Sequence, residues 1–177
     1  LQFPPVYGSN YFQLIDFNYD GYMDILTTQG DNADYSIVVK AYHGIRIFLN
    51  NGKNQFEENY FLPQYGAQKA IPVDFDKDGD LDIVSISFFP DYERFQLESF
   101  IYWENKGDKT FDRYSFRGAT DGRWLTMDAG DIDGDGDTDV ILGNAIFTVG
   151  IIPKEIRERW LTHPVSAMIL KNNMIRK

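Results

Sequence analysis

An acidic loop that recurs three times at nearly equal spacing is the feature of this sequence that most constrains its fold. The copies are DFNYDGYMDIL from Asp16, DFDKDGDLDIV from Asp74 and DIDGDGDTDVI from Asp131, and the spacings are 58 and 57 residues. The flanks repeat as well, because Phe, Pro and Tyr-Gly recur at the same offset in the stretches that begin at Phe3 and Phe61. A period of this length indicates that each copy is one supersecondary unit of a repeat protein.

Each copy has the pattern of a four-stranded antiparallel meander. In the middle copy, β-favouring runs lie near 69–74, 81–87, 99–105 and 110–116, with turn signals between them. The first copy carries a similar set from about residue 11 to residue 62. The sequence therefore predicts an all-β fold of β-propeller blades, with about three blades present.

We expect one partial β-propeller domain that spans residues 1–177. Its predicted parts are the end of a preceding blade and a linker at 1–10, blade one at 11–66, blade two at 67–122 and an incomplete blade three at 123–177. Rings of this kind contain about four to eight blades. We therefore expect the chain to be a fragment of a longer protein, or to assemble with other copies.

A short helical insertion is predicted in the third blade, at about 153–162. Pro153 suits the start of a helix, and Ile156, Trp160 and Leu161 are predicted to share one apolar face. The expected role of this insertion is a surface decoration that packs Trp160 against the sheet.

The acidic loops carry the side chains of a candidate cation site. Numbered from the first Asp, each loop has side-chain oxygens at positions 1, 3, 5 and 9, and Gly at position 6 permits the reversal of the backbone. A hard cation of calcium's size takes about six to eight such oxygens, and position 7 could add a backbone carbonyl. The predicted ligands are Asp16, Asn18, Asp20, Tyr22 and Asp24 in the first loop, Asp74, Asp76, Asp78, Asp80 and Asp82 in the second, and Asp131, Asp133, Asp135, Asp137 and Asp139 in the third.

The distribution of charge supports a metal. Thirteen of the 27 acidic residues lie in these three nine-residue loops, where unpaired carboxylates would repel and raise one another's pKa. Three divalent ions would change the formal net charge from -10 to -4. The acidity is thus mainly a property of the metal sites, although it still argues against nucleic acid and anionic membranes as partners. No apolar run approaches the roughly 18 residues of a membrane span.

Other acidic loops fit less well. An EF-hand needs Glu at position 12 and a helix on each side, whereas position 12 is Thr27, Ser85 or Leu142 and a β-favouring run follows each loop. A dockerin-type loop also leads into a helix. Solvated Asp/Gly turns between strands remain an alternative for a single copy, and three copies at one period favour the cation loop.

Taken together, the loops resemble the FG-GAP/VCBS repeats of integrin α-subunit-type β-propellers. The resemblance rests on the pattern D-x-[DN]-x-D-G-x-x-D before a β-branched run, with GDIDGDGDTDVILGN as the clearest copy, and on the downstream stretches NNGKNQF and NKGDKTF. It covers nearly the whole chain. It implies a ring of seven or eight blades, structural calcium in the loop that joins the first two strands of a blade, and a secreted or cell-surface setting. The departures are Asn18 and Tyr22, the lack of a full FG…GAP signature and the insertion in blade three.

Two functions from different classes remain open. The first is a calcium-stiffened extracellular module for adhesion, which binds a protein or glycan ligand at the cell surface, consistent with Trp103, Trp124 and the many Tyr and Phe. The alternative is an accessory propeller domain of a secreted polysaccharide-degrading enzyme. Further partners are the remaining blades of the parent chain or a second copy. The loop 31–44 is a candidate ligand contact by position.

No arrangement of residues predicts catalysis by this chain. His43 and His163 are the only histidines, and neither lies in a recognisable motif. The close carboxylate pairs that would suggest glycoside hydrolysis are already assigned to the loops. We therefore expect no catalytic residues and about three structural Ca²⁺ ions.

Overall fold

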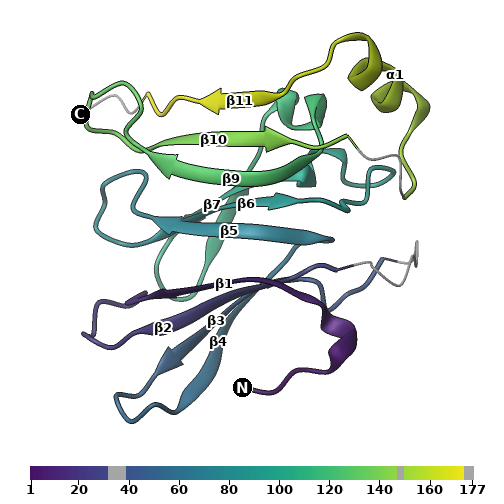
Figure 1. Ribbon diagram of the computed structural model, residues 1–177. Coiled ribbons are helices and arrows are strands. Elements are labelled where there is room, and N and C mark those ends of the chain that lie inside the picture. The colour runs from purple at the N-terminus through teal and green to yellow at the C-terminus, as the bar shows by residue number, and fades with distance from the viewer. Residues whose placement is uncertain (32–38, 147–149, 174–177) are drawn as a thin grey trace.

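The computed structural model describes residues 1–31, 39–146 and 150–173 of the chain. Within these ranges the protein is nearly all β, with three separate antiparallel sheets and one α-helix. The sheets stack one above another and do not close into a ring (Figure 1). The predicted all-β class with blade-like meanders is confirmed.

The first two sheets are complete four-stranded meanders in chain order. Each neighbouring pair of strands is antiparallel, and the connections from β1 to β2, β3 to β4, β5 to β6 and β7 to β8 are short. The strands of the first sheet are β1 (Ser9–Ile15), β2 (Asp24–Gln29), β3 (Gly44–Asn50) and β4 (Phe56–Pro63). Those of the second are β5 (Ala67–Val73), β6 (Asp82–Ser87), β7 (Phe100–Asn105) and β8 (Phe111–Tyr114).

The third sheet has three strands in the described part of the chain. They are β9 (Trp124–Gly130), β10 (Asp139–Asn144) and β11 (Ala167–Leu170), and the helix α1 (Lys154–Thr162) lies between β10 and β11. Short 3-10 helices occur at η1 (Pro5–Tyr7), η2 (Gln96–Ser99) and η3 (Arg117–Asp121). No helix in the described ranges has the length and hydropathy needed to cross a membrane.

The sheets are held together by two apolar clusters, one at each junction. Leu26, Ile45 and Ile47 of the first sheet pack against Ile83 and Trp103 of the second. The second junction buries Ile71, Val84 and Phe100 from the second sheet with Trp124, Leu142, Met127 and Val140 from the third. Because a fully buried aliphatic or aromatic side chain contributes about 1.5–3 kcal/mol, these junctions are the main source of stability.

The helix lies in the predicted place, but its predicted apolar face is wrong in one position. Ile156 and Trp160 are buried, whereas Leu161 is 68% exposed. At about 100° per residue, Leu161 points roughly 140° away from Ile156. Trp160 packs edge-on against Tyr92 and its indole N–H donates to the Thr120 carbonyl at 2.9 Å, so the helix rests on connecting segments of blade two rather than on a sheet face.

The chain before β1 covers part of the first sheet. Tyr7 stacks on Tyr42 with ring centroids 4.6 Å apart, and Phe3 packs edge-on against Phe48 at 5.5 Å. The strand β1 begins at Ser9, inside the segment 1–10 that was predicted as a linker, and the predicted boundaries at 66 and 122 fall between sheets. Residues 32–38 of the candidate contact loop 31–44 lie outside the described residues.

Candidate metal centres

Each acidic loop joins the first strand of its sheet to the second. The loops 16–24, 74–82 and 131–139 thus connect β1 to β2, β5 to β6, and β9 to β10. All three lie along one edge of the stack, at the left in Figure 1. The position of each loop between the first two strands of its sheet is the one that the sequence resemblance implied.

A shared set of hydrogen bonds folds each loop around its first carboxylate. The position-1 aspartate accepts the N–H of the position-6 glycine at 2.9 Å from Gly21, 3.2 Å from Gly79 and 3.0 Å from Gly136. The position-5 aspartate accepts the N–H of position 7 at 2.9–3.1 Å in every copy. These bonds turn the acidic side chains toward the inside of the loop before any cation is added.

The backbone conformation explains why position 6 of each loop is glycine, and it shows that position 4 also has a left-handed conformation. Gly21, Gly79 and Gly136 all have positive φ, between 88° and 100°, as predicted for the reversal. Position 4 is also left-handed, with φ of 57° at Tyr19 and 60° at Lys77. A non-glycine residue in this region is uncommon, so the loop geometry is strong enough to impose it on a tyrosine and a lysine.

The position-9 aspartates have a structural role that the sequence analysis missed. Asp24, Asp82 and Asp139 are almost completely buried. Each accepts the N–H of position 2 of its own loop through Oδ2, at 2.9–3.2 Å. Each also accepts, through Oδ1 at 2.8 Å, the N–H of an asparagine in or just after the third strand; these asparagines are Asn50, Asn105 and Asn172. Position 9 therefore ties the loop to the third strand of the same blade.

These asparagines could have been found in the sequence. Each lies in the segment that repeats downstream of the loop, in FLNNGKNQF, WENKGDKTF and LKNN. Asn50 and Asn105 donate from Nδ2 to the position-8 carbonyls of Met23 and Leu81. Asn172 instead donates to the Phe75 carbonyl of the neighbouring blade at 2.9 Å, so the third copy uses its asparagine to join two blades.

Two of the loops bring three carboxylates close together. Oxygens of Asp74, Asp76 and Asp78 lie within 4.8 Å of one another in the second loop, and so do oxygens of Asp131, Asp133 and Asp139 in the third. The predicted ligands Asp82 and Asp135 are not members of these clusters. In the first loop, position 3 is a neutral amide, and Asn18 donates from Nδ2 to Asp20 at 2.9 Å.

The second loop has the pKa shifts expected of crowded carboxylates. Burial, with the charges of Asp78, Asp82, Asp76 and Asp74, raises the pKa of Asp80 to about 6. Its Oδ1 is buried without a hydrogen-bond partner among the described residues. Burial also raises the pKa of Asp76, with the charge of Asp82 adding to the effect. A bound cation would favour the ionised form of every group in this loop.

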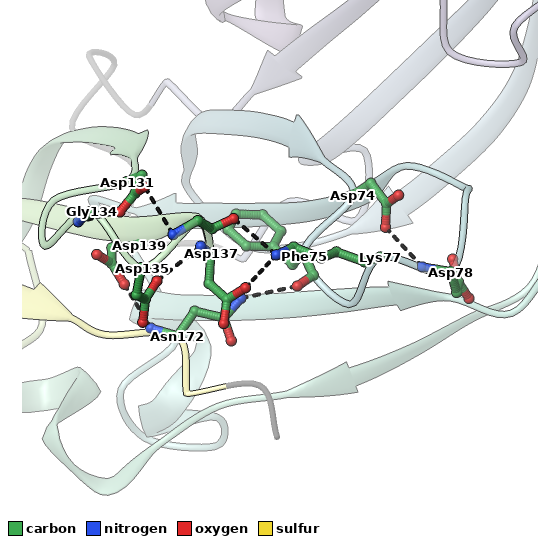
Figure 2. Close-up of polar contacts among 11 residues, drawn as sticks. Asp74, Phe75, Lys77, Asp78, Asp131, Gly134, Asp135, Asp137, Asp139 and Asn172 are labelled. Carbon is green, nitrogen blue, oxygen red and sulfur yellow. Dashed lines mark hydrogen bonds and ion pairs between the residues drawn. The ribbon is translucent and has the colours of Figure 1, made fainter. Parts of the chain in front are cut away.

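The third loop already has cationic partners. Lys77, at position 4 of the second loop, pairs with the buried Asp137 carboxylate and donates to the Gly136 carbonyl at 2.8 Å, as Figure 2 shows. Lys171 donates to Asp133 at 2.8 Å and thereby lowers the pKa of that carboxyl. Two lysines therefore offset part of the negative charge of the third loop. The carboxylates of the second loop have no such ion pair among the described residues.

A family model decides the identity of these repeats. The FG-GAP-like repeat model matches residues 16–85 and 93–142, which include all three acidic loops and most of the first two sheets. The chain belongs to the FG-GAP-like repeat family. The predicted resemblance is thereby confirmed, and the three sheets are consistent with propeller-like blades of this repeat family. FG-GAP repeats often bind Ca²⁺, are typical of extracellular proteins and are usually not catalytic. A search of curated proteins found no match.

The donor set of the FG-GAP loops fits calcium chemically. Carboxylate and carbonyl oxygens are hard ligands, and the described loops contain no histidine or cysteine that would favour zinc. Positions 1, 3 and 5 supply such oxygens in each repeat, and position 7 has a carbonyl. The position-9 oxygens keep free lone pairs in the first and third loops, whereas in the second loop Asp82 also accepts the Tyr102 hydroxyl at 2.7 Å.

Proposed function

We propose that this chain is a calcium-stabilised β-propeller module that binds a protein or glycan outside the cell and has no catalytic activity of its own. The observation that carries the proposal is the same preformed acidic loop at the same place in three stacked sheets. Calcium would be held by the predicted ligands at positions 1, 3, 5 and 9, and by the position-7 carbonyl.

The role of the ion would be structural. When bound, calcium supplies positive charge to the loop. Ionised Asp74, Asp76 and Asp78 would then remain together without mutual repulsion. Because Asp82 connects the same loop to Asn105 at the end of β7, ordering of the loop would also hold the third strand in place.

Exposed apolar faces support further blades or a second copy as partners. Phe12 and Leu14 are 54% and 67% exposed on the side of β1 that faces away from the second sheet. At the other end of the stack, Ile141 on β10 lies directly opposite Ile169 on β11, and both are exposed. Paired faces of this kind are buried at the two internal junctions, which makes additional blades the natural cover.

Chelation of calcium tests the proposal. We expect EDTA to lower the melting temperature of the protein, and added Ca²⁺ to restore it, with Mg²⁺ as the control ion because its smaller octahedral shell suits these loops less well. Asp78→Asn should reduce the stabilisation by calcium, whereas Asp112→Asn, on the exposed β8, should leave it unchanged. A melting curve that EDTA does not alter would refute the metal role.

The third loop offers a sharper test of the ligand assignment. Asp135→Asn should weaken calcium binding strongly, since its side chain is a predicted ligand. Asp137→Asn should weaken it little, because only the carbonyl of Asp137 is used. Comparable losses from both substitutions would show that the loop positions are wrongly assigned.

The alternative function is an accessory propeller of a secreted polysaccharide-degrading enzyme. It would be favoured if an activity screen of the longer parent chain detected hydrolysis of a polysaccharide. A glycan array on the present chain, run in parallel, would detect binding without hydrolysis and would favour the binding module.

A further inference from the structure

The outer face of blade three, at the upper end of the stack in Figure 1, repeats a pattern that is buried inside the stack. At the first junction, Leu26 on β2 lies opposite Ile47 on β3, and both are completely buried against blade two. Counted from the position-9 aspartate and from the repeated asparagine, the equivalent residues of blade three are Ile141 and Ile169, which also lie opposite each other. They are 38% and 50% exposed. Blade three thus presents a junction face that no described residue covers.

The outer face of blade one, at the lower end of the stack, is uncovered in the same way. Phe12 and Leu14 on β1 are 54% and 67% exposed. Their counterparts on blade two are Ala70 and Pro72, and both are buried on the side of β5 that faces blade one. The chain before β1 contacts β3 and leaves these side chains of β1 exposed.

The two end faces are complementary in the size of their side chains. At the first junction, Tyr11 and Ile15 on blade one pack onto the cluster that contains the small Ala70 of blade two. In blade three, the positions of Tyr11 and Ile15 are occupied by Thr126 and Gly130, and the space beside the Cα of Gly130 is open. The end faces reverse this distribution of bulk, because blade one carries the large side chains and blade three the small ones.

The acidic loops of the two end blades show the same relation. Between blades two and three, Lys77 at position 4 reaches Asp137 at position 7 of the next loop. Position 4 of the third loop is Gly134, which has no side chain, whereas position 7 of the first loop is Tyr22, which is 49% exposed. A junction between the two end faces would again combine a large residue with a small one.

Surface area and polarity permit such a junction. The chain exposes 9831 Å², which is about 1,000 Å² more than a compact monomer of 20.5 kDa exposes. Two copies would therefore have about 2,000 Å² to bury, an amount typical of stable interfaces. Asp128 is the one acidic side chain on the exposed side of β9, and it has the place of the half-buried Gln13 at the first junction, where a polar residue is accommodated.

We propose that two copies of this chain associate head to tail, with blade three of each copy packed on blade one of the other. Every copy carries both halves of the junction, so the contact can be made twice and closes a twofold assembly. Three blades from each copy give a ring of six, within the usual range of about four to eight. This proposal rests on the function given above, because it names a second copy as the partner that covers the ends of the module.

Sedimentation velocity of the calcium-loaded chain over a wide range of concentrations tests the assembly. We expect a particle of twice the 20.5 kDa chain mass and no larger species, because a closed ring leaves no free end face. A monomer at every concentration would overturn the proposal and favour further blades of a longer chain as the cover. Polymers that grow with concentration would overturn the closed ring.

Two variants distinguish head-to-tail contact from contact between like faces. Leu14→Glu and Ile169→Glu should each weaken the dimer about tenfold or more, because each places a charge in both junctions of the ring. An equimolar mixture of the two variants should form dimers again, since one of its two junctions then contains no substitution. Leu97→Glu, at an exposed position on η2 of blade two, is the control and should have no effect. An effect of only one of the two substitutions, or no recovery in the mixture, would overturn the proposal.

The melting temperature of Leu14→Glu separates this proposal from the metal role. The variant retains all three acidic loops, so EDTA should lower its melting temperature and Ca²⁺ should restore it. A monomeric chain that calcium still stabilises would refute the ring alone. A dimer that EDTA does not destabilise would refute the metal role alone.

Discussion

The second and third acidic loops have the same backbone but opposite electrostatic environments. In the second loop, burial and the charges of the neighbouring aspartates raise the pKa of Asp80 to about 6, and one oxygen of that carboxylate has no hydrogen-bond partner in the part of the chain that the structure describes. In the third, the equivalent Asp137 pairs with Lys77, and Lys171 pairs with Asp133. Equal motifs in one repeat protein therefore need not respond equally to the removal of metal, because the side chains outside the motif set the charge balance.

The largest loss of stability should come from removal of the buried position-9 aspartate, which all three loops share. Asp82→Ala removes the acceptor of the Phe75 N–H, the Asn105 N–H and the Tyr102 hydroxyl. Leaving these buried donors unpaired should cost about 3 kcal/mol or more of unfolding free energy, measured by urea denaturation in EDTA so that metal does not contribute. Asp112→Ala, on the exposed face of β8, is the control. A cost below about 1 kcal/mol would show that position 9 matters only through the metal.

Removal of Lys77 should make the third loop resemble the second. Lys77→Gln leaves the buried Asp137 carboxylate unpaired, and the expected loss is about 1.5 kcal/mol in EDTA. Combination with Asp137→Asn should recover much of this loss, because the unpaired charge is then absent. Additive losses in the double-mutant cycle would mean that the two side chains do not interact.

The dependence of stability on pH should reveal the raised pKa of Asp80 in the second loop. The folded pKa of Asp80 is about 6, above the ordinary 3.8, so between these values the folded protein binds more protons than the unfolded chain. In EDTA, the stability that Asp80 contributes should therefore rise as the pH falls from about 7 to about 4. Asp80→Asn should remove this slope and add about 1 kcal/mol at pH 7, after allowance for solvent screening. An unchanged slope in denaturation at several pH values would contradict the assignment.

The smallest effect is expected at Lys171. Calcium in the third loop must compete with the ammonium group that already contacts Asp133. Lys171→Gln should therefore tighten calcium binding at this loop by about threefold, as expected for loss of an exposed ion pair. The titration is best made with Asp20→Asn and Asp78→Asn present to weaken the other two loops. The exposed Lys53→Gln is the control, and a weaker rather than tighter third site would refute the competition.

Much of the fold could be predicted because it is local and repeated. The runs near 69–74, 81–87, 99–105 and 110–116 correspond to β5, β6, β7 and β8, and the helix begins one residue after Pro153. Glycine at position 6 has the positive φ that its place in the loop required. Period, turn residues and β-branched runs are enough to define such elements.

The rest depends on contacts between distant segments. The pairing of Lys77 with Asp137 depends on how two blades stack, and a single repeat contains no sign of it. Asp24, Asp82 and Asp139 also tie each loop to the third strand of its blade. To predict this role, one must know where the third strand ends. A pocket lined by Glu98 lies where the connection between β6 and β7 meets the end of β8, and that connection has no counterpart in the repeated pattern of the sequence.

The position-4 side chain gives the repeats a fixed order. Lys77 of the second repeat reaches the position-7 aspartate of the third. Tyr19 occupies position 4 of the first repeat, where burial, and then the charges of Asp74 and Asp80, raise its pKa. A gene rearrangement that exchanged the first two repeats would place a tyrosine beside the buried carboxylate of Asp137. Duplication can therefore copy a blade, but each copy must then adapt to its neighbour, and shuffling becomes harder as these adaptations accumulate.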